Sequence, residues 1–197
     1  MPSQYFLQDD KVGLRPLEDA DAAQLCNWVN DQAVLVYLGI PGRLTEGQEL
    51  AWIAAMRGSH TDVVLGIVDL TDGLLVGTVG LHLINRTDSH AMYGIMLGNK
   101  ERWSRGLGTA AGMLACDYAF NTLNLQRLHL TVADFNPRGT KSYERIGFQH
   151  EGRLRQHVFK QGGYHDVLFM GLLRDVFNRQ HSAWREAQAQ RYGIELG

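Results

Sequence analysis

The chain alternates short apolar runs with segments in which apolar residues recur every three to four positions. Runs of the first kind are typical of strands and cover residues 12–17, 63–70, 74–83, 90–98, 127–132, 148–159 and 164–172. Segments of the second kind predict helices over residues 18–30, 45–57, 110–119, 138–146 and 174–192. Strands and helices alternate in the second half, which favours an α/β (α+β) chain on a mixed sheet.

Local signals set several boundaries of these elements. Thr45 and Gln48 have the spacing of a capping box and predict the start of the second helix. Asp72-Gly73 and Gly162-Gly163 are typical hairpin turns between the runs that flank them. The sequence has no internal repeat and no low-complexity segment. We therefore expect residues 1–197 to form a single domain, with a core over about 12–173 and a terminal helix over about 174–192.

Composition excludes several functional classes. A chain of 197 residues that is 45% hydrophobic can bury one good core. Its net charge of −2 gives no overall basic field for nucleic acid or an anionic membrane. Cys26 and Cys116 are far apart and have no metal-ligand spacing, so we expect two buried thiols, no disulfide and no metal. No apolar run reaches transmembrane length and no leader is evident, so a soluble cytoplasmic protein is expected.

The stretch Trp103-Ser-Arg-Gly-Leu-Gly-Thr-Ala-Ala predicts a loop that opens directly into a helix, after the apolar run that ends at Gly98. The first turn of a helix presents unpaired backbone N–H groups and the positive end of the helix dipole, so it binds phosphate well. Gly106 and Gly108 lack a Cβ and would let the backbone approach a pyrophosphate closely. Taken alone, this stretch equally fits a tight strand-to-helix connection with surface arginines.

A second motif follows two elements later and reads Asn136-Pro-Arg-Gly-Thr-Lys-Ser-Tyr-Glu-Arg-Ile-Gly-Phe148. In order and separation the two motifs resemble the acetyl-CoA motifs of the GNAT superfamily of N-acetyltransferases. These are the R/Q-x-x-G-x-G/A pyrophosphate loop and the N-x-x-A-(x)-Y-E-K-x-G-F helix and strand. Segments 14–21 and 163–168 also resemble the Rim-type branch, which acts on the N-termini of ribosomal proteins. The sequence departs from the superfamily at Trp103, where Arg or Gln is frequent, and at Gly139, where Ala or Ser is usual.

The resemblance, which spans about residues 12–173, implies a single-domain GNAT-like fold. Its mixed, mostly antiparallel sheet is flanked by helices, and the strands at 90–98 and 127–132 run parallel and splay apart. Acetyl-CoA would enter the slot between them as acyl donor. The residues that the resemblance assigns to its binding are Met96, Leu97, Gly98, Arg102, Ser104, Arg105, Gly106, Leu107, Gly108, Thr109 and Asn136.

Tyr143 is the general acid that the resemblance implies for the departing thiolate. A phenol stays protonated at neutral pH and can give its proton to a thiolate. Without the motif, the commoner interpretation is an ordinary helix tyrosine with a packed ring. Two roles are likewise open for Asn136, a hydrogen bond to pantetheine and the N-cap of a helix, and one side chain can fill both.

The sequence identifies no general base. Many GNAT enzymes carry a glutamate near the middle of the fourth strand, and Met92 stands at the corresponding position. The candidate substitutes, each more often a structural polar residue, are His82, His90, Asp134, His157, His165 and Asp166.

This missing carboxylate favours a weakly basic acceptor. An α-amino group with a pKa of about 7.7–8.0 is roughly a tenth neutral at pH 7, whereas a lysine amine near 10.4 is below about a thousandth. We therefore expect direct acetyl transfer to a protein or peptide N-terminal α-amine, such as that of a ribosomal protein. The alternative enzyme acts on a small molecule: an amino sugar, antibiotic, amino acid or polyamine. The alternative outside enzymes is a non-catalytic acyl-CoA-binding module, against which the retained Tyr143 argues.

The acceptor side would be formed by the first two helices and the long hairpin. Its aromatic residues fit either a groove wall or the core, and they are Trp28, Tyr37, Trp52, Phe159, Tyr164 and Phe169. Hairpins at this position often support dimers in the superfamily, so the resemblance also implies a homodimer.

Overall fold

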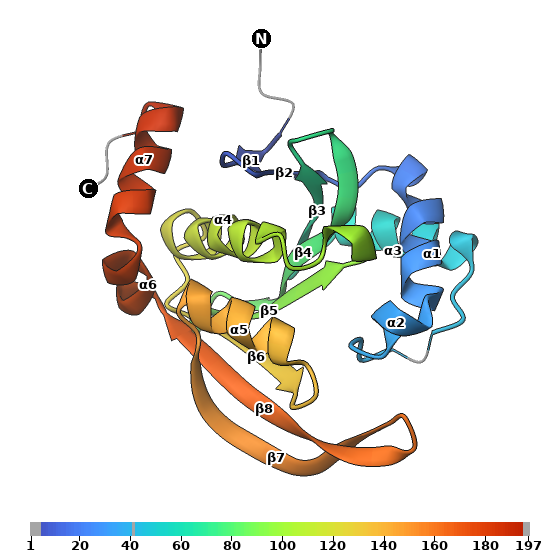
Figure 1. Ribbon diagram of the computed structural model, residues 1–197. Coiled ribbons are helices and arrows are strands. Elements are labelled where there is room, and N and C mark those ends of the chain that lie inside the picture. Colours follow the sequence, from blue (N-terminus) through green and yellow to red (C-terminus); the bar gives the residue numbers. More distant parts are fainter. Residues whose placement is uncertain (1–4, 41, 195–197) are drawn as a thin grey trace.

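The computed structural model describes residues 5–40 and 42–194, and its strands form one eight-stranded sheet (Figure 1). The strand order across the sheet is β1-β2-β3-β4-β5-β6-β8-β7. The strands are β1 (Leu7–Gln8), β2 (Val12–Pro16), β3 (Val63–Asp69), β4 (Leu74–Asn85), β5 (His90–Leu97), β6 (Arg127–Ala133), β7 (Gln149–Lys160) and β8 (Gly163–Leu173). The helices are α1 (Ala22–Asn30), α2 (Gln32–Leu35), α3 (Glu46–Arg57), α4 (Leu107–Asn121), α5 (Pro137–Ile146), α6 (Arg174–Gln180) and α7 (Ser182–Tyr192), with 3₁₀ turns η1 (Asp19–Asp21) and η2 (Lys100–Arg102).

A short parallel pairing lies in the middle of this sheet. β5 and β6 pair over three residues each, and the last pair is Met92 with His129. The two strands part beyond that pair, while all other described neighbours in the sheet are antiparallel. This arrangement confirms the predicted α/β fold with its splayed parallel pair. The gap opens toward the carboxyl ends of both strands, where the two motif segments begin.

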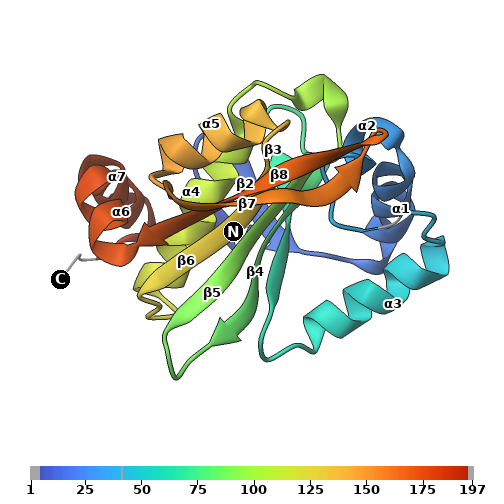
Figure 2. The ribbon, with the colours of Figure 1, turned by 90° about the horizontal axis from the view of Figure 1, so that it is seen from below.

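Successive side chains of each strand point to opposite faces of the sheet, and apolar ones form a layer on each face. On one face Tyr93 of β5 and Leu128 of β6 join the main core, which packs on α4. On the other face Met96 of β5 packs on a smaller cluster that holds Leu25 of α1 and Ile53 of α3. Figure 2 shows α4 and α5 on one side of the sheet and α3 on the other.

One glycine of α4 allows this helix to lie close to its neighbours. A Cβ on Gly112 would stand 2.4 Å from Cδ1 of Ile146 in α5 and 2.7 Å from the hydroxyl oxygen of Tyr93 in β5. A Cβ atom essentially never lies that close to another heavy atom, so a larger residue would force these neighbours to shift. The close packing holds the interior of α4 against Tyr93 of β5 and Ile146 of α5.

Most predicted boundaries are confirmed within one or two residues. Thr45 and Gln48 form the capping box at the start of α3, and Gly73 has a φ of 74° in the β3–β4 turn. The predicted terminal helix over 174–192 is wrong in one respect, because it breaks at His181 into α6 and α7. There the His181 ring packs 5.0 Å from Phe177, and its Nε2 lies 2.9 Å from the carbonyl oxygen of Ile146. The pattern also missed the short β1 and α2.

The two cysteines differ in their surroundings. Both are free thiols in the described chain; Cys116 is buried, but Cys26 is only half-buried. Burial raises the pKa of the Cys116 thiol well above its usual value, so it is a poor nucleophile. Groups of His, Cys, Asp and Glu that could hold a metal ion are absent from the described residues. Within the same residues, every helix is too short or too polar to span a bilayer.

Candidate active site

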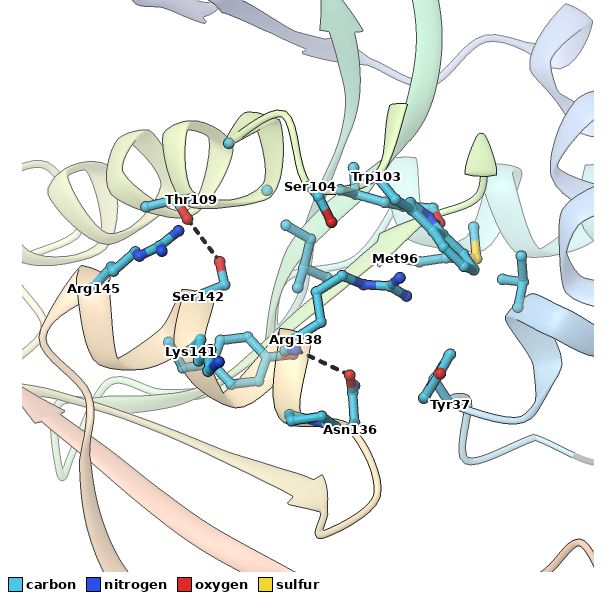
Figure 3. Close-up of a pocket in the computed structure, with 18 of the residues that line it drawn as sticks. Tyr37, Met96, Trp103, Ser104, Thr109, Asn136, Arg138, Lys141, Ser142 and Arg145 are labelled. Atoms are coloured by element: carbon cyan, nitrogen blue, oxygen red, sulfur yellow. Dashed lines mark hydrogen bonds between the residues drawn. The ribbon is translucent and has the colours of Figure 1, made fainter. Parts of the chain in front are cut away.

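A pocket of about 510 Å³ lies at the splayed end of β5, between the start of α4 and the inner side of α5 (Figure 3). Val34 and Tyr37 from the α2 region close its far side. Eight of the residues predicted for the site line this pocket, and they are Met96, Leu97, Ser104, Gly106, Gly108, Thr109, Asn136 and Tyr143. Four do not line it: Gly98, Arg102, Arg105 and Leu107. The structure thus brings both motifs to one cavity.

The start of α4 presents free backbone donors to the pocket. Gly106 is the N-cap residue with a φ of 83°, a left-handed conformation that glycine adopts without strain. The first backbone hydrogen bond of the helix runs from the Ala110 N–H to the Gly106 carbonyl. Among the described residues, no acceptor contacts the backbone N–H groups of residues 104–109. Leu107 buries its side chain in the core and contributes only backbone here. These donors form a cradle suited to a phosphate group.

Three cations that the motif comparison did not single out face the same cavity. Arg138, Lys141 and Arg145 of α5 line it at helical spacings of three and four. None of them forms an ion pair with a described acidic residue. Lys11, directly before β2, approaches the loop, with its Nζ 3.7 Å from where a Cβ on Gly106 would lie. Unpaired cations around free N–H groups fit a ligand that carries several phosphates, as coenzyme A does. The recurring basic positions 138, 141 and 145 were the sequence signal for them.

Arg138 also stacks on the aromatic wall of the pocket. Its guanidinium carbon lies 3.7 Å from the centre of the Trp103 ring and 5.6 Å from that of Tyr37. The Trp103 indole donates a 2.7 Å hydrogen bond to the Leu97 carbonyl. Trp103, which departs from the motif, therefore anchors the loop to β5 and positions Arg138.

Arg102 is the predicted phosphate contact that the structure assigns elsewhere. Its guanidinium donates to Asp69 at 2.9 Å and also to Asp72, which ties the η2 turn to the β3–β4 turn. Burial of Asp69 opposes its ionisation, but hydrogen bonds from Thr71 and the charge of Arg102 hold its pKa below the usual value. Arg102 is thus committed to two carboxylates, and its expected role at phosphate is not supported. The reason lies in long-range pairing that a local motif does not encode.

Gly98 and Arg105 have other positions than the motif implied. A Cβ on Gly98 would lie 2.0 Å from the Trp28 ring, so this glycine makes room for the indole in the smaller core. Trp28 is accordingly core and not a groove wall, whereas Tyr37 does line the pocket. Arg105 is exposed beside the loop.

Tyr143 points its ring into the wall between pocket and core. It lies edge-on to Tyr93 at 6.0 Å and to Phe148 at 6.2 Å between ring centres. Burial raises the pKa of Tyr143 to about 12, which keeps the hydroxyl protonated across the physiological range. No hydrogen-bond partner for that hydroxyl occurs in the described part of the chain. The group is therefore a free proton donor at the pocket.

Asn136 caps α5 and at the same time lines the pocket. Its side-chain oxygen accepts a 3.0 Å hydrogen bond from the Gly139 N–H. A Cβ on Gly139 would stand 2.7 Å from the Asn136 amide nitrogen, which explains glycine at this departure from the motif. A 2.9 Å hydrogen bond between the hydroxyls of Thr109 and Ser142 holds α5 against α4 (Figure 3).

The candidate bases do not gather at one point. Asp134 and Asp166 both pair with Arg153 of β7, and the His165 ring stands 3.7 Å from Asp134. His157 lies on the exposed β7 strand. His82 and His90 remain, on the sheet face opposite α4. His82 of β4 pairs with Met92, and His90 precedes Met92 in β5 itself.

Comparison with known proteins agrees with this geometry. The family model for the acetyltransferase (GNAT) domain matches residues 11–149. Spermidine N(1)-acetyltransferase of Escherichia coli K12 is 34% identical over 185 residues, which cover 92% of this chain and 93% of that protein. A putative ribosomal N-acetyltransferase of Bacillus subtilis is 34% identical over 105 residues, 53% of this chain and 57% of its own. The crystal structure of Vibrio cholerae spermidine N-acetyltransferase with CoA and spermine superimposes with a TM-score of 0.79 at 27% identity, over 86% of this chain and 99% of that one. The chain belongs to the GNAT superfamily, and it is an acyltransferase that uses acetyl-CoA.

Proposed function

We propose that this enzyme transfers the acetyl group of acetyl-CoA directly to a primary amine of a small polyamine. The observation that carries the proposal is the similarity to spermidine N(1)-acetyltransferase, which extends over 92% of this chain and so includes the pocket and the sheet face behind it. Neither cysteine lines the pocket, which supports direct transfer without a covalent enzyme intermediate. This acceptor is the alternative that the sequence left open.

The pocket residues divide the binding of acetyl-CoA between them. The N–H groups of residues 104–109 hold the pyrophosphate, and Arg138, Lys141 and Arg145 supply the charges around the phosphates. The edge of β5 that faces β6 is unpaired beyond Met92, and there, up to Met96 and Leu97, it offers strand groups to the pantetheine amides. Asn136 stands at the mouth of that slot. Arg102 is left out of this set because its two carboxylate partners satisfy it.

Tyr143 protonates the leaving thiolate with its hydroxyl proton. A pKa of about 12 makes the phenol a weaker acid than in water. Burial raises the pKa of thiols as well, so the free-energy difference for this proton transfer is smaller than a comparison of Tyr143 with a thiol in water suggests. The retained donor supports an enzyme over a pure acyl-CoA-binding module.

A second acceptor, the α-amine of a peptide or ribosomal protein, has its own support. The chain is similar over about half its length to a putative ribosomal N-acetyltransferase. Met92 also leaves the centre of β5 without a carboxylate, which suits an amine that is partly neutral at pH 7.

A competition experiment decides between these acceptors. Spermidine and an Ala-starting peptide are offered together at equal concentration with acetyl-CoA, and the acetylated products are counted by mass spectrometry. The proposal expects acetylspermidine in at least about tenfold excess, since a tenfold ratio of kcat/KM is only about 1.4 kcal/mol of differential transition-state binding. An excess of acetylated peptide would move the assignment to the α-amine.

We also retain the homodimer as a proposal. β7 ends the sheet, and its free edge is long, from Gln149 to Lys160. An unpaired edge strand is a template for pairing with a second chain. A monomer mass in light scattering at micromolar concentration would contradict it.

A further inference from the structure

Two histidines flank Met92 on the sheet face opposite α4. His82 of β4 pairs with Met92 in the antiparallel register, and His129 of β6 pairs with it in the parallel register. Residues directly opposite in neighbouring strands point to the same face of a sheet. Because Met92 and His129 form the last β5–β6 pair, this row marks the inner end of the slot between the two strands. The imidazoles therefore border the position from which the superfamily's glutamate is missing.

A bulge in β4 aims His82 along the strand toward the open slot. The register of β4 and β5 shifts directly after His82, and the next residue, Leu83, has a φ of 51° and is 65% exposed. Leucine rarely adopts such a left-handed conformation, and bulges of this kind re-aim side chains next to active sites. The strained backbone is held in place, because the Leu83 N–H donates to Asp62 at 3.4 Å.

Two facing glycines leave room for the redirected imidazole. Gly80 of β4 and Gly94 of β5 are opposite each other in the register. A Cβ on Gly80 would lie 2.6 Å from Nε2 of His82, and a Cβ on Gly94 would lie 3.4 Å from the same atom. The Nε2 edge of the ring thus lies over this glycine pair, one step beyond Met92 in the direction in which the strands part.

Asp62 fixes the orientation of the His82 ring. Its Oδ1 lies 3.1 Å from Nδ1 of His82. Burial alone would raise the pKa of this carboxyl, but hydrogen bonds from two hydroxyls, from His82 and from the Leu83 N–H hold it below its usual value. An ionised Asp62 keeps a proton on Nδ1, and in the neutral imidazole this leaves the lone pair on Nε2, over the glycines.

His129 has no such support. Burial, then the neighbouring His90 and Arg127, lower its pKa, and only Glu151 acts in the opposite sense. The ring centres of His90 and His129 are 5.7 Å apart, and the Nδ1 of His90 has no partner among the described residues. His129 is therefore a weaker base than a histidine in water, and no carboxylate of the described chain fixes its ring as Asp62 fixes that of His82.

We propose that His82, oriented by Asp62, is the general base that accepts the proton of the acceptor amine in this enzyme. The nitrogen lone pair forms the bond to the thioester carbonyl carbon while one N–H proton passes to Nε2 of His82. The C–S bond breaks, its electron pair stays on sulfur, and the thiolate takes the proton of Tyr143. His82 and Tyr143 lie on opposite faces of the sheet, so the amine and the leaving group are served from opposite sides of the slot. The inference rests on the proposed amine acetylation.

The test compares His82→Gln with the matched variant His129→Gln, using spermidine as acceptor. General-base catalysis is worth about 100- to 10,000-fold, so His82→Gln should lower kcat/KM at least about 100-fold. His129→Gln should stay within about threefold of wild type, and both should bind acetyl-CoA as wild type does. Added imidazole should restore part of the rate to His82→Ala and none to His129→Ala, which a purely structural role would not allow.

A displaced imidazole gives an independent measurement. Gly80→Ala keeps His82 but puts a methyl group 2.6 Å from the present position of Nε2, so the ring has to move, and turnover should fall while acetyl-CoA affinity holds. Equal turnover of His82→Gln and wild type, or equal loss in both histidine variants, would overturn the assignment of the base. Absence of turnover in wild type with every amine would instead overturn the proposed function itself.

Discussion

The phosphate cradle at the start of α4 predicts that Gly106→Ala weakens acetyl-CoA binding. Gly106 has a φ of 83°, and a Cβ there would meet only the Lys11 Nζ, at 3.7 Å, among the described atoms. The substitution is therefore sterically possible within the protein, and its penalty is conformational. An alanine favours negative φ, which turns the N–H groups of the loop away from the pocket.

The magnitude follows from the conformation. Holding a non-glycine residue in the left-handed region costs about 1–2 kcal/mol. If the loop of the variant relaxes to negative φ without ligand, binding has to restore the left-handed conformation and its cost is subtracted from the binding free energy. At about 1.36 kcal/mol per tenfold, the dissociation constant of acetyl-CoA should rise about 5- to 30-fold.

Isothermal titration of acetyl-CoA into wild type, Gly106→Ala and Gly193→Ala measures this effect. Gly193 is a matched control, because it also caps a helix at positive φ, 65°, but at the end of α7 and away from the pocket, and a Cβ there would meet nothing within 4 Å. Gly193→Ala should lower Tm by about 2–4 °C per kcal/mol and leave the dissociation constant within about twofold. Wild-type affinity in Gly106→Ala would show that these N–H groups do not hold the ligand.

Three further predictions concern the same region. Tyr143→Phe should lower kcat about 100-fold with unchanged acetyl-CoA affinity. Because burial raises the pKa of Tyr143 to about 12, ionisation of this hydroxyl should not lower kcat/KM below about pH 11. A fall in kcat/KM near pH 10 that disappears in the variant would contradict this environment. Arg145→Gln should weaken acetyl-CoA binding about tenfold and flatten its salt dependence, since charge-assisted hydrogen bonds contribute about 1.5–3 kcal/mol. The control Arg179→Gln, at an exposed arginine, should change neither the affinity nor its salt dependence. Equal effects of the two substitutions would mean that Arg145 acts only through net charge. Gly98→Ala should lower the free energy of unfolding by about 1–3 kcal/mol in urea titration, because the Cβ of the alanine would overlap the Trp28 ring. An unchanged midpoint of urea unfolding would mean that the indole moves aside.

Local chemistry explains which parts of the fold could be predicted. The capping box at Thr45, the turn at Gly73 and the N-cap at Asn136 each depend on residues within four positions, and all three are confirmed. The break at His181 depends on a carbonyl 35 residues away, so helix periodicity alone ran through it.

The same distinction separates the contacts at the site that the motifs could reveal from those that they could not. The two motifs meet at one cavity because each lies at the carboxyl end of a splayed strand. The pairing of Arg102 with Asp69 and Asp72 was not evident from the motif, because these partners are about 30 residues earlier. The Asp62–His82 pair was similarly hidden, since it depends on a bulge that hydrophobic alternation does not reveal.

The central claim is that this pocket supports acetyl transfer to an amine, and thiol release from acetyl-CoA tests it most directly. Wild type is assayed with spermidine, Ala- and Ser-starting peptides, aminoglycosides and free amino acids, and acetyl-CoA binding is measured on the same sample. The account predicts release that depends on the amine and is fastest with spermidine. Tight binding of acetyl-CoA without release in the presence of any amine would contradict it and indicate an acyl-CoA-binding protein.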